Sequence, residues 1–400
     1  MKKLKIGFMV IVLLIMSACS YDELKINDID RYPQATGAYF SKMQDNIIRE
    51  KGIIKQNDEY DFRCADLSKI DLSNILDINQ CQFDSRTIWP SQLPDNFDPK
   101  TLLESGKEIG LNIQKLHQEG IGGQGVNIAI IDTALLVDHS EFKDRIKLYK
   151  EYNIDRDQPI EMHGTAVASI AVGSSVGVAP KANLYYLADT SIGDGGQMDL
   201  TNFANDIERL IKFNQNAKES DKIQIISLSI GANNNTLGKD KFDQAVKKAQ
   251  ENKITVLWVS NDPTISQYFG TGKELASSYD EVSSIRPAVF LKEDIDRNHE
   301  LYQERLLIPM DQRTCASFTG KNDYFYQSIG GMSYVIPYVA GIYALALQVD
   351  PSISFEDFTS YAKATATTVS YQSDNQNIVF GKYIDGYKLI KAIQEKAKST

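Results

Sequence analysis

The stretch Val-Asn-Ile-Ala-Ile-Ile-Asp-Thr, residues 126–133, decides the fold. It is apolar at nearly every position up to Asp132, which is typical of a strand buried on both faces of a parallel sheet. In an open α/β sheet, functional groups gather at the carboxyl ends of the strands. We therefore predict a parallel strand that places Asp132 at the functional edge of a sheet.

Three further apolar runs have the same texture and predict strands: residues 182–188, 223–230 and 254–259. Between them lie two stretches with helical spacing of apolar residues, one carrying Leu200, Phe203, Ala204, Ile207, Leu210 and Ile211, the other Phe242, Ala245, Val246 and Ala249. Strands that alternate with such helices predict an α/β fold, in which a mostly parallel sheet is covered on both sides.

Composition excludes several classes of protein. The chain has 400 residues, 42% of them hydrophobic, with 25 Gly and 11 Pro, which does not fit a disordered, fibrous or polytopic membrane protein. Its formal net charge is −10, and it lacks a long cluster of Lys and Arg. Because affinity for nucleic acid comes mainly from such clusters, we expect no nucleic-acid partner.

The N-terminus has the pattern of an export signal. Lys2, Lys3 and Lys5 precede an apolar stretch that ends in Met16-Ser-Ala-Cys19, and this stretch is too short to span a bilayer permanently. The small residues before Cys19 resemble the lipobox of bacterial lipoproteins. We expect residues 1–18 to be removed and Cys19 to be lipidated, so that the protein lies outside the cytoplasm on the bacterial cell membrane. The alternative is an ordinary secretory signal with an incidental cysteine.

Residues 19–110 predict a small N-terminal appendage, because they are polar with short apolar clusters. Within residues 65–79, Ala-Asp-Leu-Ser-Lys is followed by Ile-Asp-Leu-Ser-Asn, which resembles pentapeptide repeats. Two clean units are too few for a repeat domain, so a packed coil or a loop is favoured. Export would permit a Cys64–Cys81 disulfide, but the odd count with Cys315 slightly favours free thiols.

Two further motifs carry catalytic residue types. His163-Gly-Thr opens a segment of small residues, and Gly-Gly-Met-Ser333 precedes an apolar run that contains Pro337. Because proline is tolerated in the first turn of a helix, Ser333 is expected at a helix N-terminus, where backbone amides favour negative charge. A serine nucleophile needs a histidine base, and that base needs an orienting carboxylate, so Asp132, His163 and Ser333 form a coherent set in the order Asp, His, Ser.

The motifs around these residues resemble those of the subtilisin-like serine peptidases. The resemblance rests on Ile-Ile-Asp-Thr (130–133), His-Gly-Thr-Ala-Val-Ala (163–168), Gly-Val-Ala-Pro-Lys-Ala (177–182) and Gly-Met-Ser-Tyr-Val-Ile-Pro-Tyr-Val-Ala-Gly (331–341). It implies a three-layer subtilisin-like fold with a mostly parallel central sheet, in a peptidase domain over residues 111–396.

The resemblance also implies roles for single residues. Asp132 becomes the orienting carboxylate, His163 the general base and acid, Ser333 the nucleophile and Asn261 the side-chain donor to the oxyanion. It further implies substrate-binding residues in two segments, namely Ser229, Ile230 and Gly231, and Gly195 and Gly196. A phosphate-binding loop is the rival interpretation of the two latter glycines, although they lack its spacing.

Several positions depart from the family pattern: Met332, Tyr334, Val335, Tyr338 and Ser260 stand where the family usually has other residues. Bulk around Ser333 would narrow the cleft or shift the nucleophile, so a peptide-binding protein without turnover is the first alternative to a peptidase. A solute-binding lipoprotein is the second, and it leaves the ordered motifs unexplained.

The expected protein is thus an exported, lipid-anchored serine endopeptidase that acts on polypeptides. We expect it to be a monomer and to need no cofactor for its chemistry. Structural calcium is common in the family, but its ligands are not identifiable here. Asp138 and Glu141 are expected on a solvated surface. Residues 19–110 are either a propeptide or a permanent stalk.

Overall fold

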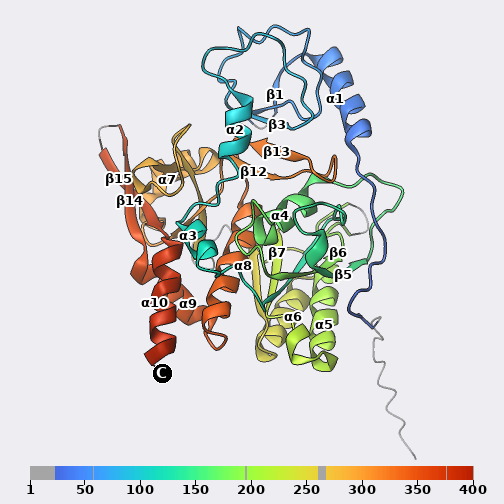
Figure 1. The fold of residues 1–400 in the computed structure, drawn as a ribbon, viewed down its shortest axis with the longest axis vertical. Helices are drawn as coiled ribbons and strands as arrows, with labels where there is room; N and C mark the ends of the chain where they lie inside the picture. Colours follow the sequence, from blue (N-terminus) through green and yellow to red (C-terminus); the bar gives the residue numbers. More distant parts are fainter. Residues whose placement is uncertain (1–22, 57, 194–195, 260–266, 375, 400) are drawn as a thin grey trace, which may run out of the picture.

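The computed structural model describes residues 23–56, 58–193, 196–259, 267–374 and 376–399. A five-stranded parallel sheet forms the centre of the molecule (Figure 1). In spatial order its strands are β5 (Ile146–Glu151), β6 (Asn183–Ala188), β4 (Asn127–Asp132), β7 (Ile225–Gly231) and β8 (Thr255–Val259). The four strands predicted from their apolar runs are β4, β6, β7 and β8, and all four are confirmed.

Helices cover both faces of this sheet. One face packs against α4 (Met162–Val172) and α8 (Met332–Val349), and the other against α5 (Thr201–Asn216) and α6 (Lys239–Glu251). Successive residues of β4 point to opposite faces, so Ile130 joins the first core and Ile131 joins the second. The predicted three-layer α/β architecture is confirmed.

Helix α8 runs through the core. Among the described helices it alone has the length and hydropathy of a membrane span, yet 78% of that stretch is buried inside the protein. The Ala, Val and Ile residues of α8 pack on α4 and the central sheet. Its apolar character is therefore explained by its place in the core.

A second sheet is mixed and lies beside the first. Its order is β10 (Ile285–Pro287), β9 (Tyr268–Lys273), β11 (Leu306–Pro309), β15 (Gln376–Tyr383) and β14 (Thr367–Ser373). The remaining helices of the described chain are α1 (Gly37–Lys51), α2 (Pro99–Ser105), α3 (Ile113–Gln118), α7 (Lys292–Asn298), α9 (Phe355–Thr365) and α10 (Gly386–Ser399). Short 3₁₀ turns span Lys143–Arg145, Glu219–Asp221, Val282–Ser284, Val289–Leu291 and His299–Leu301.

A third sheet joins the N-terminal appendage to the rest of the protein, at the top of Figure 1. Its strands are β1 (Lys55–Gln56), β2 (Glu59–Asp61), β3 (Cys81–Asp84), β13 (Tyr324–Gln327) and β12 (Arg313–Ala316). Strand β3 pairs antiparallel with β13, with Tyr326 opposite Phe83. The appendage therefore continues a hairpin that belongs to the C-terminal half of the chain.

The pentapeptide-like stretch of the appendage forms a packed coil. The amides of Ala65, Ile70 and Ile75 each donate to the carbonyl three residues earlier, so one turn recurs every five residues. Leu67 and Leu72, at the centres of the two clean units, are buried. Cys64, Cys81 and Cys315 are buried free thiols, as favoured from the sequence.

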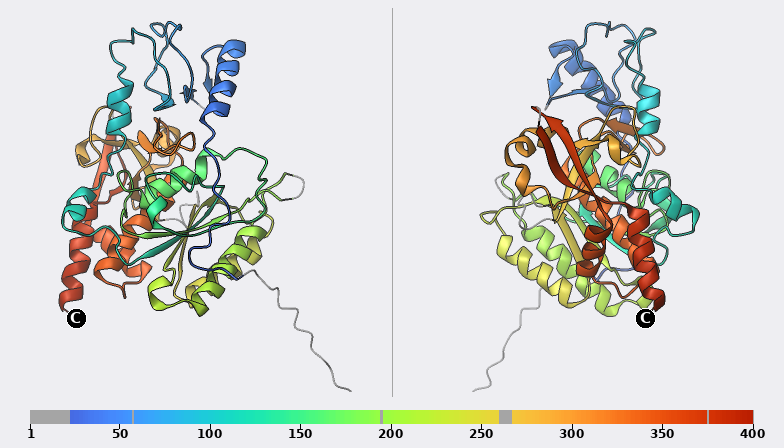
Figure 2. Two further views of the ribbon diagram at one scale, coloured as in Figure 1. Left: turned by 45° about the vertical axis from the view of Figure 1, so that its right-hand side comes forward. Right: turned by 90° about the vertical axis from the view of Figure 1, so that its left-hand side faces the viewer.

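The chain before α1 runs along the flank of the molecule (Figure 2). Ile29 forms a parallel bridge with Tyr149 of β5, and the amides of Asn27 and Asp30 donate to carbonyls of β5. Residues 27–30 thus extend the central sheet by a short edge segment, which brings the N-terminal part of the chain close to the carboxyl ends of the central strands.

Candidate active site

Asp132 is the last residue of β4, and its side chain faces His163. Asp132 Oδ1 accepts a hydrogen bond from His163 Nδ1 at 2.7 Å and a second from the Thr133 amide at 2.8 Å. The Asp132 side chain is 5% exposed, while that of His163 is 33% exposed. A buried carboxylate therefore fixes the ring of a histidine whose side chain is partly exposed.

His163 is the second residue of α4, so the helix start sets its position. Gly164 makes this possible, because a Cβ there would lie 2.4 Å from the Thr133 carbonyl oxygen and 2.4 Å from the Tyr186 hydroxyl. Burial by itself lowers the pKa of His163, but the charge and the hydrogen bond of Asp132 outweigh burial and raise this pKa above its usual value. The imidazole is thus poised to accept a proton.

Ser333 is the second residue of α8, a helix that begins directly after the extended Gly331. The prediction that Pro337 lies in the first turn was wrong, because α8 starts at Met332 and Pro337 lies inside the helix. Proline has no amide proton to donate to the carbonyl four residues earlier, which is that of Ser333. The Ser229 hydroxyl donates to this carbonyl at 2.8 Å and so replaces the missing helical bond.

The Ser333 hydroxyl is half-buried and donates to the Ser229 carbonyl at 3.4 Å. Among the contacts of the described residues, none is a hydrogen bond between His163 and Ser333. The structure therefore brings Asp132 and His163 together and joins Ser333 to Ser229 of β7. Catalytic hydrogen bonds in unliganded enzymes are often long or poorly aligned, so this arrangement is compatible with a catalytic serine.

A cavity of about 490 Å³ opens where these strands end, and Asp132, His163, Ser229 and Ile230 line it. Of the predicted substrate-binding residues, Ser229 and Ile230 thus face the cavity. Gly231 and Gly196 are exposed and do not line it, and the Gly196 amide donates to the Gly193 carbonyl at 3.1 Å. Asn261, Gly195 and Cys19 lie outside the described residues.

Asp189 is one of the charged residues of this cavity that the sequence interpretation missed. Asp189 directly follows β6, close to Asp132 at the end of β4, and its amide donates to the Asp132 carbonyl at 2.9 Å. Burial raises the pKa of Asp189, although Asn153 and the Thr190 amide donate to its carboxylate. The position of Asp189 at a strand end was a usable signal in the sequence.

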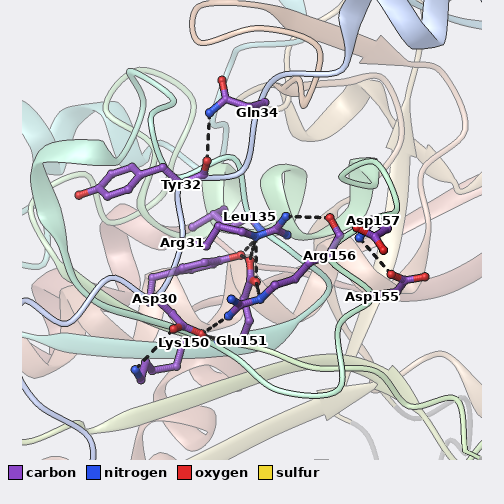
Figure 3. A network of polar contacts seen from close by, with 11 residues as sticks. Asp30, Arg31, Tyr32, Gln34, Leu135, Lys150, Glu151, Asp155, Arg156 and Asp157 are labelled. Carbon is purple, nitrogen blue, oxygen red and sulfur yellow. Dashed lines mark hydrogen bonds and ion pairs between the residues drawn. The ribbon is translucent and has the colours of Figure 1, made fainter.

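Arg31 is another missed residue of the cavity, and it comes from the segment before α1. Its guanidinium donates to both carboxylate oxygens of Glu151, at 3.0 and 2.9 Å, and the Glu151 side chain is 1% exposed (Figure 3). Arg156 also contacts Glu151, at 3.0 Å. No sequence pattern indicated that a residue so near the N-terminus would form the wall of this cavity.

The bulky residues around Ser333 point into the protein. Met332, Tyr334 and Tyr338 are 8%, 3% and 0% exposed and do not line the cavity. The Tyr334 hydroxyl donates to Gln327 Oε1 at 2.7 Å, and the Tyr338 hydroxyl donates to the Ile109 carbonyl. These three departures from the family pattern therefore fill the core near Ser333 and do not narrow the cavity.

Glu141 is not on a solvated surface, which corrects the expectation from the sequence. It is 2% exposed, and its carboxylate accepts hydrogen bonds from the Ser175 amide and hydroxyl. These bonds and the Tyr324 hydroxyl stabilise the charge, so the pKa of Glu141 lies below its usual value despite burial. Asp138 is partly exposed and pairs with Lys321 at 2.8 Å. Within the described ranges, no cluster of three or more His, Cys, Asp or Glu side chains is arranged to hold a metal ion.

Comparisons with known proteins agree with this geometry. The model of the subtilase family matches residues 123–279. Two curated relatives are an intracellular serine protease of Paenibacillus polymyxa, 27% identical over 62% of this chain and 75% of that protein, and a thermostable alkaline protease of Halalkalibacterium halodurans, 24% identical over 64% of this chain and 66% of that protein. Subtilisin-like protease 1 of Pseudogymnoascus destructans is 28% identical over 56% of this chain and 52% of its own length.

Among solved structures, the prenylagaramide maturation protease PagA has a TM-score of 0.48 and 18% identity, over 70% of this chain and 98% of that chain. The chain thus spans from about half to three quarters of the length of the curated relatives named above. The family model thus identifies a subtilase region at residues 123–279 of the chain, and the curated relatives to which the chain is similar are serine proteases.

Proposed function

We propose that the protein is an exported, lipid-anchored serine endopeptidase whose catalytic residues are Asp132, His163 and Ser333. The observation that carries this proposal is the 2.7 Å contact between His163 Nδ1 and the buried Asp132 carboxylate, while Ser333 lies in the first turn of α8. A histidine held in this way has a fixed tautomer, with Nε2 free to accept a proton.

In the proposed reaction, Ser333 Oγ attacks the carbonyl carbon of a peptide bond while His163 Nε2 takes the hydroxyl proton. Asp132 keeps the Nδ1 proton and stabilises the imidazolium. The Ser333 amide at the start of α8, together with the Asn261 side chain, donates hydrogen bonds to the oxyanion. His163 then gives its proton to the leaving amine, and water hydrolyses the acyl-enzyme.

Reaction with a fluorophosphonate tests this assignment, because the reagent labels activated serines. The soluble chain, residues 20–400, is expected to be labelled, and labelling is expected to disappear in both Ser333→Ala and His163→Ala. Ser191→Ala, which changes another serine of the same cavity, serves as the matched control. Labelling that persists in folded Ser333→Ala would overturn the assignment of the nucleophile.

The alternative is a subtilase-like protein that binds peptides without turnover. The observation that favours it is the Ser333 hydroxyl, which donates to the Ser229 carbonyl and not to His163. It predicts a folded wild-type protein that binds peptides saturably, yet neither reacts with the fluorophosphonate nor cleaves them. Turnover of any peptide would exclude this alternative.

The anchor and the remaining properties are proposed on the sequence pattern. Cys19 carries the lipid, residues 1–18 are the cleaved signal, and residues 111–396 are the peptidase domain after an appendage formed by 19–110. We propose a monomer that needs no cofactor for its chemistry. Mass spectrometry of the membrane-bound protein is expected to find a lipidated N-terminal Cys19, and Cys19→Ser is expected to abolish membrane attachment.

A further inference from the structure

The backbone just before the nucleophile is held by a residue of the N-terminal appendage. Strand β13 ends at Gln327, and only five residues separate it from Ser333. Glu59 Oε1 accepts hydrogen bonds from the Ser328 amide at 2.7 Å, the Ser328 hydroxyl at 2.6 Å and the Ile329 amide at 3.0 Å. The appendage therefore contacts the segment that leads directly to the proposed nucleophile.

Glu59 is a carboxyl group whose charged form is disfavoured by burial. It is 3% exposed, and no ion pair of the described residues includes it. Burial raises its pKa, although the hydrogen bonds from residues 327–329 oppose that shift. A buried acid without a cation is retained only where its hydrogen bonds compensate for lost hydration, and here those bonds all come from the segment before Ser333.

A second buried carboxyl group, that of Asp311, accepts a hydrogen bond from the same segment. Asp311 Oδ1 accepts from the Gly330 amide at 2.9 Å, while Asp311 Oδ2 accepts from the Val289 amide at 2.9 Å. A Cβ at Gly330 would lie 2.1 Å from the Met310 carbonyl oxygen, so the segment is pressed closely against the chain beside Asp311. The three successive amides of residues 328, 329 and 330 thus donate hydrogen bonds to two buried carboxyl groups, Glu59 and Asp311, which lie far apart in the sequence.

The position of Glu59 depends on sheet pairing. Tyr60, next to Glu59 in β2, lies opposite Cys81 of β3, and β3 pairs with β13 up to Gln327. The Ser328 amide also reaches the Cys81 carbonyl, at 3.1 Å. The strands that attach the appendage to the protein therefore also place Glu59 beside residues 328–331.

We propose that Glu59 is a positioning residue for Ser333, so that the N-terminal appendage completes the active site. This inference rests on the proposed peptidase function. Glu59 acts through residues 328–331, which fix where α8 begins and hence where the Ser333 hydroxyl and amide lie. Rates of acyl transfer are sensitive to such placement, since about 1 Å of displacement costs on the order of a hundredfold.

The test compares Glu59→Ala and Glu59→Gln with Asp61→Asn in the full soluble chain. Asp61 lies in the same strand and pairs with Arg63 at 2.7 Å, so its variant perturbs the appendage without touching residues 327–331. Glu59→Ala is expected to slow fluorophosphonate labelling and to lower kcat by about tenfold to a hundredfold, with little change in KM. Glu59→Gln keeps one acceptor oxygen and is expected to lose less, and Asp61→Asn to label like the wild type.

Hydrogen exchange of the 324–335 segment provides a readout that does not depend on activity. Glu59→Ala is expected to speed exchange in this segment while α5 exchanges as in the wild type. Unchanged exchange at 324–335 would overturn the inference even if the wild type proved inactive. Wild-type rates of labelling in a folded Glu59→Ala protein would overturn it while leaving the peptidase assignment intact, whereas an unlabelled wild type would reject the peptidase assignment alone.

Discussion

His163 illustrates how one neighbour sets the chemistry of a side chain. Its partial burial favours the neutral ring, but the adjacent Asp132 carboxylate favours the charged ring by more, and the pKa rises. A base must be deprotonated to accept the serine proton. Activity is therefore expected to fall as pH drops through this raised pKa, at a higher pH than for an unperturbed histidine.

Replacing Asp132 with Asn tests this relation. Asn cannot stabilise the imidazolium and permits the wrong tautomer, so kcat is expected to fall by about 10⁴-fold. The pKa of His163 loses the influence that raises it, and the acid limb of the kcat/KM profile is expected to move to lower pH. The measurement is a pH series of peptide hydrolysis for both proteins; an unshifted limb with nearly full activity would contradict the role of Asp132.

Asp311 is a second residue whose titration has a calculable consequence. Burial raises its pKa from 3.8 to about 7, so the folded protein holds this proton between those values while the unfolded chain has released it. The stability contributed by the proton is complete below pH 3.8 and is lost as pH rises through about 7. Each such proton changes the free energy of unfolding by at most about 1.4 kcal/mol per pH unit.

Replacing Asp311 with Asn is expected to reduce the dependence of the free energy of unfolding on pH. Asn does not titrate, so the free energy of unfolding of the variant is expected to lack this fall with pH, and its single acceptor oxygen cannot serve both the Gly330 and the Val289 amides. Urea unfolding at several values between about pH 4 and pH 8 measures the difference from the wild type. Parallel pH profiles for the two proteins would show that Asp311 does not titrate in this range.

Helix α8 shows at the scale of an element what the sequence could and could not predict. The Gly-Met-Ser motif and the apolar run correctly predicted that Ser333 starts a buried helix. Pro337 suggested a first-turn position, yet the helix contains it, because the Ser229 hydroxyl from β7 donates to the carbonyl that Pro337 cannot serve. That compensation comes from a strand about a hundred residues earlier, and no local pattern encodes it.

A double-mutant cycle can test whether Ser229 and Pro337 are coupled through the Ser333 carbonyl. Ser229→Ala leaves the Ser333 carbonyl without its donor and is expected to cost about 1–3 kcal/mol of stability and to slow labelling of Ser333. Pro337→Ala restores an amide donor to the same carbonyl. The double variant is therefore expected to recover part of the loss, and equal losses in the single and double variants would contradict the coupling.

The parallel strands were the most predictable elements, because each is apolar along its length and buried on both faces. Asp132 and His163 were predictable as a pair for the same reason, since strand ends and helix starts meet at one edge of a parallel sheet. Arg31 and Glu59 were not. Both reach the site region through pairing between segments more than a hundred residues apart, which leaves no periodic signal in the sequence.

At the scale of the whole molecule, the appendage and the remainder of the chain form a continuous structure. The β3–β13 ladder, the Ile29–Tyr149 bridge and the buried Arg31–Glu151 pair cross from one to the other at separate places. If the appendage left, the 324–327 strand would keep its pairing with β12 but lose its pairing with β3, and Glu151 would lose one of its two guanidinium contacts. This arrangement favours a permanent appendage over a propeptide that dissociates.

The corresponding prediction is that cutting the chain between Ser91 and Gln92, both exposed, leaves the two pieces associated. A cleavage sequence for a specific protease inserted there would permit the cut after folding. Because strand pairing and buried ion pairs hold the pieces, we expect them to co-elute under native conditions, to retain fluorophosphonate labelling, and to separate only in denaturant. On cells, the 92–400 piece would then stay attached to the membrane through the lipid that we propose for Cys19. If the 92–400 piece eluted alone and remained active, the appendage would be a removable propeptide, and neither membrane retention nor the role of Glu59 would follow.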